Sequence, residues 1–288
     1  MRLSFAAGAV AVLTIVACGL PSGAGVPQVS PPTQALAAWV GFPAGQIPRP
    51  IVLFWDLRPS GGAYSSGDSK LAGMCGKFAL SEPLPAQVPS QAIATWADGT
   101  SATYAAISAA DAFSAMAHTL TGMGGADCAS VPALPVTGAR FATASFQTDR
   151  GIAQMSAWRF SSPGAVGELD FPAIPPSAFW GGGTSNLSSN GSATVSAEGR
   201  SLMFGFTGAR TDGPCGAAYK GVAAESNTAV AVAIQDIPNS TSDTGNCTLE
   251  GYPRSVTVPL QSKLGGRVVV DASGNAVTVC PAAPAKAC

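Results

Sequence analysis

The sequence predicts a mainly β protein with some α structure. Short runs of β-branched and aromatic residues, separated by Gly, Asp, Asn and Ser turns, recur along the 288 residues, and one stretch alone has helical spacing. A segment rich in Pro and Gly interrupts this pattern at residues 172–192 and reads as a linker. We therefore expect an N-terminal α+β domain at 35–171, with an antiparallel sheet and one helix, and a C-terminal Ig-like β-sandwich at 193–288.

The first part of the N-terminal domain is expected to contain strands and a hairpin. The apolar run at 51–57 predicts a strand, followed by a turn and a polar loop that reaches Lys70. Residues 76–81 predict a second short strand. Strand-type residues flank the turn Asp98-Gly99, which predicts a hairpin over 92–107.

The expected helix follows directly. Ser108 is a suitable N-cap, and apolar residues then recur at steps of three and four until Gly122. The face they form consists of Ala109, Ala112, Phe113, Met116 and Leu120. After the helix we expect a hairpin at 140–160 and one more strand at 168–174.

Seven short strands are expected in the second half, with turn signals between them and no helix. They lie at 193–197, 201–207, 218–225, 228–234, 255–260, 267–271 and 276–280. Such spacing is typical of a sandwich, and a small barrel is the alternative.

The N-terminus is expected to carry an export signal. An apolar run up to Ala17 follows Arg2, and it is too short to span a bilayer. Ile15-Val16-Ala17 before Cys18 resembles the lipobox of bacterial lipoproteins, which implies cleavage after residues 1–17 and lipid on Cys18. Residues 18–34 then form a flexible tether rich in Pro, Gly and Ser. The alternative is an uncleaved or differently cleaved signal in which Cys18 is an ordinary apolar residue.

The cysteine count agrees with lipidation. The chain has seven cysteines, and removing Cys18 leaves six, which outside the cytoplasm suggests three disulfides among 15 possible connectivities. Adjacency within each domain favours three sequential pairs, namely Cys75 with Cys128, Cys215 with Cys247, and Cys280 with Cys288. No C-x-x-C pair is present and there is a single histidine, so we expect no metal site.

Composition limits the partners. Charged residues make up 11% of the chain, and removal of Arg2 with the leader leaves 14 basic and 16 acidic residues, a net charge of −2. Nucleic-acid binding and electrostatic attachment to anionic lipid both need clustered Lys and Arg. We therefore expect no nucleic-acid partner, and no motif indicates a cofactor.

A resemblance covers roughly the last 110 residues and the leader. The residues that carry it are Cys215-Gly216, Tyr219, Val230-Ala231-Val232, Cys247-Thr248, Tyr252-Pro253-Arg254-Ser255-Val256 and Leu264-Gly265-Gly266-Arg267-Val268-Val269-Val270-Asp271. With the lipobox, this pattern resembles uncharacterised exported lipoproteins of actinobacteria, including mycobacteria. The resemblance implies an envelope location and disulfides, and it brings no catalytic residue.

Two groups of residues have side chains that could serve catalysis, and we expect neither to do so. His118 lies seven residues after Asp111 on the expected helix, but no G-x-S-x-G elbow and no S-x-x-K motif supplies a nucleophile. A position near the helix end explains the histidine equally well. Glu168 and Asp170 share one face of a strand, as two glycosidase carboxylates could, although this spacing fits any solvated strand.

Aromatic residues are the candidates for lining a binding groove. The chain has five tryptophans, Trp39, Trp55, Trp96, Trp158 and Trp180. Trp55 and Trp96 fall within expected strands and are predicted to be core residues. Phe179 and Trp180, in the linker, are predicted to pack on a domain rather than stay in water. If the protein has a ligand groove, aromatic residues are expected to line it, and the candidate binding residues are Phe179, Trp180 and Trp158.

These observations predict a lipid-anchored cell-envelope protein with a non-catalytic binding or scaffolding role. The alternatives are an envelope hydrolase with an unrecognised site and a carrier of an apolar ligand. An acidic pair or the histidine in a cleft would favour the hydrolase, and a closed apolar cavity would favour the carrier. A flat, exposed apolar patch would favour binding to an envelope protein.

Overall fold

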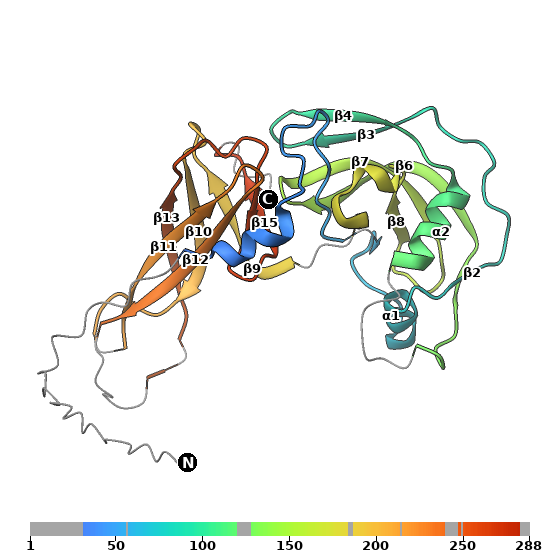
Figure 1. The fold of residues 1–288 in the computed structure, drawn as a ribbon. Coiled ribbons are helices and arrows are strands. Elements are labelled where there is room, and N and C mark those ends of the chain that lie inside the picture. Colours follow the sequence, from blue (N-terminus) through green and yellow to red (C-terminus); the bar gives the residue numbers. More distant parts are fainter. Residues whose placement is uncertain are drawn as a thin grey trace, which may run out of the picture.

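The protein is mainly β, as predicted, and its two large sheets lie in different parts of the chain (Figure 1). The computed structural model describes residues 31–55, 57–119, 128–183, 187–213, 215–239, 247–248 and 250–282. The expected leader and Cys18 lie outside these residues. In the part of the chain that is described, no helix is both long and apolar enough to cross a bilayer.

The first sheet is built around one long strand. Its members are β1 (Arg58–Pro59), β3 (Gln91–Trp96), β4 (Ser101–Ala105), β6 (Gly138–Thr148), β7 (Gly151–Ser161) and β8 (Glu168–Pro172). β7 pairs with β6 along its whole length, whereas its other edge pairs first with β3 and then with β8, all antiparallel. β2 (Phe78–Leu80) and β5 (Leu134–Val136) form a separate parallel pair.

Both predicted hairpins of this half are confirmed. The β3–β4 turn places Gly99 at φ +82°, and the β6–β7 turn places Gly151 at φ +86°. Side chains rarely adopt this left-handed backbone, so glycine allows the tight connection at both points. The strands predicted at 76–81 and 168–174 are also confirmed, as β2 and β8.

The predicted helix is confirmed as α2 (Ala109–Thr119). The Ser108 hydroxyl accepts the Asp111 backbone N–H at 3.0 Å and donates to the Asp111 carboxylate at 2.6 Å, which caps the helix. Ala109, Ala112 and Met116 are fully buried in the cluster that covers β8. Leu120 and Gly122, also expected in or after this helix, lie outside the described residues.

The prediction of a polar loop that reaches Lys70 is wrong. Residues Gly67–Met74 form a second helix, α1, whose N-cap is Ser66. The Ser66 hydroxyl accepts the Ser69 backbone N–H at 3.0 Å, and Asp68 places a negative charge in the first turn. Only Ala72 and Gly73 are buried, so the helix lacks the apolar periodicity that would have predicted it.

The prediction of a strand at 51–57 is also wrong. This run makes isolated β-bridges at Ile51 and Leu53 instead of a continuous ladder of strand pairing. Ile51 and Leu53 pack into the core of the first sheet, whereas Val52 and Phe54 pack against side chains of the second sheet. The run is therefore buried on both faces between two sheets. Trp55, predicted to be a core residue, is 50% exposed, and Trp96 is confirmed as a core residue.

The second sheet contains all seven of its predicted strands. They are β9 (Leu187–Val195), β10 (Ser201–Gly208), β11 (Ala217–Glu225), β12 (Ala229–Pro238), β13 (Tyr252–Pro259), β14 (Val268–Val270) and β15 (Ala276–Cys280). Their order is β11-β12-β14-β15-β9-β10-β13, with parallel pairing at β12–β14 and β15–β9. In the described residues from 187 onward there is no helix, as expected.

This sheet curls until its two edge strands, β11 and β13, touch. Glycine allows their approach, because a Cβ at Gly221 would lie 2.4 Å from Val258 Cγ2. Leu202, Val230 and Val269 are fully buried inside the curl. The strands are thus hydrogen-bonded as one continuous sheet around a single core.

The segment expected to be a linker contains ordered elements. It includes the short 3₁₀ helices η2 (Pro176–Ala178) and η3 (Trp180–Gly183), and β9 begins within it. Phe179 packs on the core of the first sheet, whereas Trp180 stacks on Trp39 at a ring-centroid distance of 6.3 Å. The prediction that both aromatic residues pack on a folded part of the chain is therefore confirmed.

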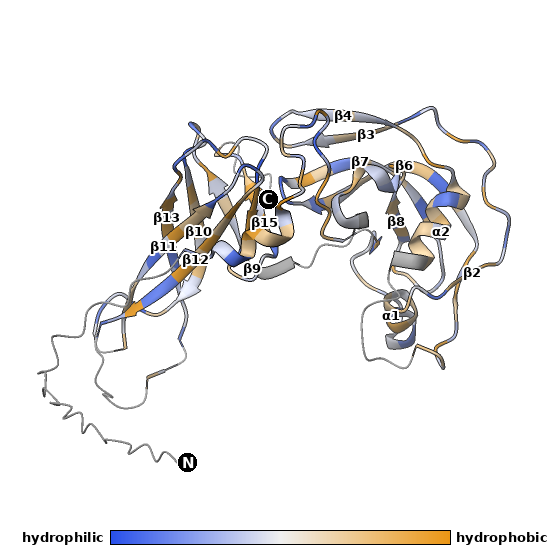
Figure 2. Ribbon diagram, in the orientation of Figure 1, coloured by the Kyte–Doolittle hydropathy of each residue, from blue (hydrophilic) through white to orange (hydrophobic). Residues whose placement is uncertain are grey.

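A further 3₁₀ helix, η1 (Thr33–Trp39), covers part of the second sheet. It contacts β11 and β12, and its Trp39 indole donates to the Gly274 carbonyl at 2.9 Å. Figure 2 shows the hydrophobic residues of β12 and β15 close to this helix. The chain ahead of β1 thus packs on the second sheet as well as on the first.

Two of the three expected disulfides are confirmed. Cys75 is bonded to Cys128 and Cys215 to Cys247. Cys280 is disulfide-bonded as well, and Cys288, its expected partner, lies outside the described residues. Disulfides are typical of an oxidising, extracytoplasmic environment.

Candidate ligand-binding groove

A polar groove of about 460 Å³ lies at one end of the second sheet. One wall is the loop after β13, at 261–267, and the other is the turn between β11 and β12. Ala44 and Gly45 close it from the segment ahead of β1. The groove is lined by Ala44, Gly45, Glu225, Ser226, Asn227, Gln261, Ser262, Lys263, Leu264, Gly266 and Arg267.

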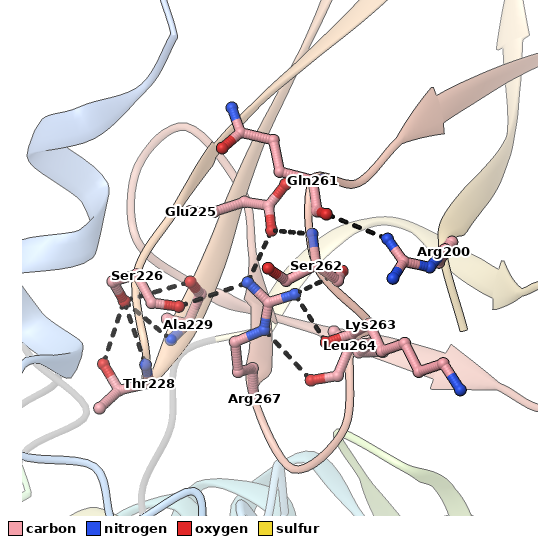
Figure 3. Close-up of polar contacts among 10 residues, drawn as sticks. All are labelled: Arg200, Glu225, Ser226, Thr228, Ala229, Gln261, Ser262, Lys263, Leu264 and Arg267. Carbon is pink, nitrogen blue, oxygen red and sulfur yellow. Dashed lines mark hydrogen bonds and ion pairs between the residues drawn. The ribbon is translucent and has the colours of Figure 1, made fainter. Parts of the chain in front are cut away.

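Arg267 organises the loop that forms this wall. Its guanidinium donates to the backbone carbonyls of Ser262 and Lys263, both at 2.9 Å (Figure 3). It also donates to the carbonyls of Leu264 at 3.2 Å and Ser226 at 3.3 Å. One side chain therefore holds four carbonyls from both walls. The Arg267 side chain is only 9% exposed, whereas Ser262 and Lys263, which supply two of the carbonyls, lie at the surface.

Glu225 completes this arrangement from the end of β11. Its carboxylate accepts from Arg267 at 2.7 Å and from the backbone N–H groups of Gln261 at 2.5 Å and Ser262 at 3.3 Å. Burial alone would raise the pKa of Glu225, but these three donors outweigh it and hold the pKa below its ordinary 4.5. Glu225 is therefore charged and fully paired. We call Glu225 and Arg267 the clamp.

The lowered pKa of Glu225 predicts a loss of stability in acid. A carboxylate whose pKa is lower in the folded state contributes stability above its ordinary pKa, and that contribution disappears as the pH falls through the folded value. Between about pH 7 and about pH 3, the wild type should therefore lose more free energy of unfolding than Glu225→Gln. Urea unfolding at a series of pH values measures both. Parallel curves for the two proteins would contradict this assignment.

A second contact fixes the loop from the side of the first sheet. Arg49 Nε donates to the Gly266 carbonyl at 2.6 Å, and its Nη atoms pair with the Asp149 carboxylate at 2.5 and 3.3 Å. Both side chains are buried, at 8% and 3% exposure. Gly266 is required here, because a Cβ would lie 2.1 Å from the Ala44 carbonyl oxygen. The loop is thus held from two sides.

Besides the clamp, the polar side chains of the groove are those of Ser226, Asn227, Gln261, Ser262 and Lys263, and the Ser226 hydroxyl is hydrogen-bonded within its own turn. In Figure 3 the side chains of Gln261 and Lys263 extend away from Arg267. They offer amide, hydroxyl and ammonium groups, which donate and accept hydrogen bonds in many combinations. The groove can therefore bind a polar ligand on a rigid frame.

The aromatic residues predicted as binding candidates do not meet at this groove. Trp158 is buried in the first sheet, where its indole donates to the Ile107 carbonyl at 2.9 Å. Phe179 and Trp180 fill the space between the two sheets. None of the three residues lines the groove.

The acidic pair considered for catalysis is occupied by arginines. Glu168 pairs with Arg140, and Asp170 pairs with Arg159 at 2.9 Å. Burial raises the pKa of Asp170 above its ordinary 3.8, and the charge of Arg159 opposes that shift. The His118 side chain lies outside the described residues, and Asp111 is engaged in the helix cap.

Sequence analysis missed the clamp, although its two residues carry a weak signal. Arg267 stands directly before the apolar Val268-Val269-Val270, and Glu225 ends a strand beside a Ser-Asn turn. In a chain with 11% charged residues, such positions are unusual, but they do not show which charges meet. No protein-family model, curated protein or solved structure matches this chain. Function must therefore be argued from the groove itself.

Proposed function

We propose that this chain is a lipid-anchored protein of the cell envelope that binds a polar partner in the groove and does not catalyse a reaction. The observation that carries the proposal is the clamp. A single buried arginine, paired with Glu225, holds four backbone carbonyls on both walls of the groove.

A binding site is favoured when its loops are already fixed in the unbound protein. A loop that is already fixed loses little conformational entropy when a ligand arrives, so more of the contact energy appears as affinity. The clamp and the Arg49 contact supply this order from two directions. The side chains of Asn227 and Lys263 are then presented on a rigid backbone.

The lining favours a polar partner. Amides, hydroxyls and one ammonium match a surface rich in hydroxyl or amide groups, such as an envelope glycan or a polar face of an envelope protein. An apolar carrier would instead need an enclosed cavity with apolar walls. The groove is open and its lining is polar, which supports partner binding over transport.

The proposal includes the anchor and the domain arrangement expected from the sequence. Lipid on Cys18 would hold the chain at the membrane, and the tether at 18–34 would let the folded part reach its partner. An N-terminal α+β unit at 35–171 and an Ig-like unit at 193–288 would present the groove. The disulfides support this location outside the cytoplasm.

Site-specific photo-cross-linking in living cells tests this function. A photoreactive amino acid at Asn227 should give discrete adducts with an envelope component, and Lys263→Glu in the same chain should reduce them severalfold. The matched control carries the photoreactive residue at Gln91, an exposed position on β3. The mass of the mature chain reports the lipid at Cys18. Equal adducts from both positions, or an unmodified Cys18, would contradict the proposal.

A further inference from the structure

A second, smaller hollow lies next to the groove. It has a volume of about 150 Å³ and shares only Leu264 and Arg267 with the groove. Residues from both sheets line it: Arg49, Asp98, Asp149, Arg150, Val195, Leu264, Gly265, Arg267, Val269, Val279 and Pro281. We call it the Arg150 pocket.

Most of the charges in the Arg150 pocket are already paired. Arg49 is bound to Asp149, and Arg267 is bound to Glu225. The Asp98 carboxylate accepts from the backbone N–H and the hydroxyl of Thr100 at 2.9 and 2.6 Å. Among the arginines that line the pocket, Arg150 is the one that makes no ion pair with any described residue.

Arg150 is nevertheless held firmly. Its guanidinium lies over the Trp96 ring, 3.6 Å from the centroid. Its Nε atom is buried and has no hydrogen-bond partner in the described part of the chain, and the same is true of the Tyr104 hydroxyl. Burial lowers the pKa of Arg150, since removing a cation from water disfavours its charged form. An anion would offset this cost directly.

The walls define the rest of the ligand. The apolar part of the lining consists of Val195, Leu264, Val269, Val279 and Pro281. A cavity of about 150 Å³ can hold a ligand of about six non-hydrogen atoms. Asp98 and Asp149 place negative charge on the same pocket, which disfavours a dianion such as phosphate.

We propose that the Arg150 pocket binds a small aliphatic monocarboxylate. The planar guanidinium of Arg150, fixed on Trp96, would donate two hydrogen bonds to the carboxylate, and the alkyl chain would lie against the valines. This site goes beyond the proposed function of the groove. Arg150 does not line the groove, and Lys263 does not line the pocket.

Binding of butyrate, which has six non-hydrogen atoms, tests the proposal. We expect saturable binding by calorimetry, with a change in tryptophan fluorescence because the ligand would sit beside the guanidinium that covers Trp96. Butyramide, the neutral analogue, should bind at least about tenfold more weakly, since it cannot pair with the cation. Arg150→Met, which keeps a long apolar side chain over Trp96, should lower butyrate affinity by a similar factor.

Two control variants test the assignment further. Val195→Phe fills the pocket from its wall and leaves Arg150 in place, so it should also abolish butyrate binding even if Arg150→Met fails to fold. Lys263→Glu, which weakens the groove, should leave butyrate binding unchanged and thereby separates the two proposals. Equal binding of butyrate and butyramide, tighter binding of inorganic phosphate, or no butyrate binding by the wild type would overturn the assignment.

Discussion

Replacing Arg267 by methionine is expected to lower the free energy of unfolding by about 3–5 kcal/mol, the usual cost of removing one partner from a buried ion pair. The Glu225 carboxylate would remain charged and 10% exposed, with only two backbone N–H groups as donors. Four carbonyls on the two walls of the groove would lose the donor that now holds them together. Denaturant unfolding at neutral pH measures the loss.

A matched control shows whether burial is the cause. Arg210 pairs with Asp212 on the surface, where both side chains are more than half exposed, so Arg210→Met should lower the free energy of unfolding far less than Arg267→Met does. The double variant Glu225→Gln/Arg267→Met should lose less than the sum of its single variants, because no unpaired charge remains buried. If Arg267→Met were no more costly than Arg210→Met, the clamp would not be a stabilising element.

Features determined by neighbouring residues could be predicted from the sequence. The turn at Asp98-Gly99 requires a left-handed backbone, and Ser108 supplies a cap directly before an apolar helical face. Such signals are complete within a few residues, so the hairpins and α2 follow from them without knowledge of the fold. The cysteine pairs could be predicted because each lies within one expected unit.

The run at 51–57 shows where such reasoning fails. Four consecutive apolar residues look like a strand buried in a single sheet, but Ile51 and Leu53 belong to one core while Val52 and Phe54 belong to the other. Apolar periodicity reports that a residue is buried, not which element buries it. A segment that packs between two sheets therefore has the same run of consecutive apolar residues as a central strand of one sheet. Trp55, in the same run, is half exposed at the surface.

The candidate site was not predictable for a related reason. Glu225 and Arg267 are 42 positions apart, and Arg49 and Asp149 are 100 apart. Each residue alone is consistent with a solvated surface charge, the most frequent state of Arg and Glu. Only the three-dimensional path of the chain brings them together and buries them. Their function as a frame for the groove therefore appears only in the folded protein.

The disulfide between Cys75 and Cys128 is expected to contribute about 4 kcal/mol, since it closes a loop with a sequence separation of 53 residues. That loop contains β2, β3, β4 and α2. Without the disulfide, these segments have more conformational freedom in the unfolded chain, which lowers the stability of the folded state. Cys75 also ends α1 and is buried in the same cluster as α2. The variant Cys75→Ala/Cys128→Ala should therefore unfold at a clearly lower denaturant concentration than the wild type.

The second disulfide supplies the matched comparison. Cys215–Cys247 has a sequence separation of 32 residues, and the same entropy argument gives about 3.7 kcal/mol for Cys215→Ala/Cys247→Ala. The described residues of its loop form β11 and β12, which belong to the second sheet, so loss of this bond should leave the first sheet intact. Hydrogen exchange can resolve this difference, because amides of β3 and β7 should lose protection in the first variant and keep it in the second. Unchanged protection of β3 and β7 in the first variant, or a loss below about 1 kcal/mol, would show that the first sheet does not depend on its disulfide.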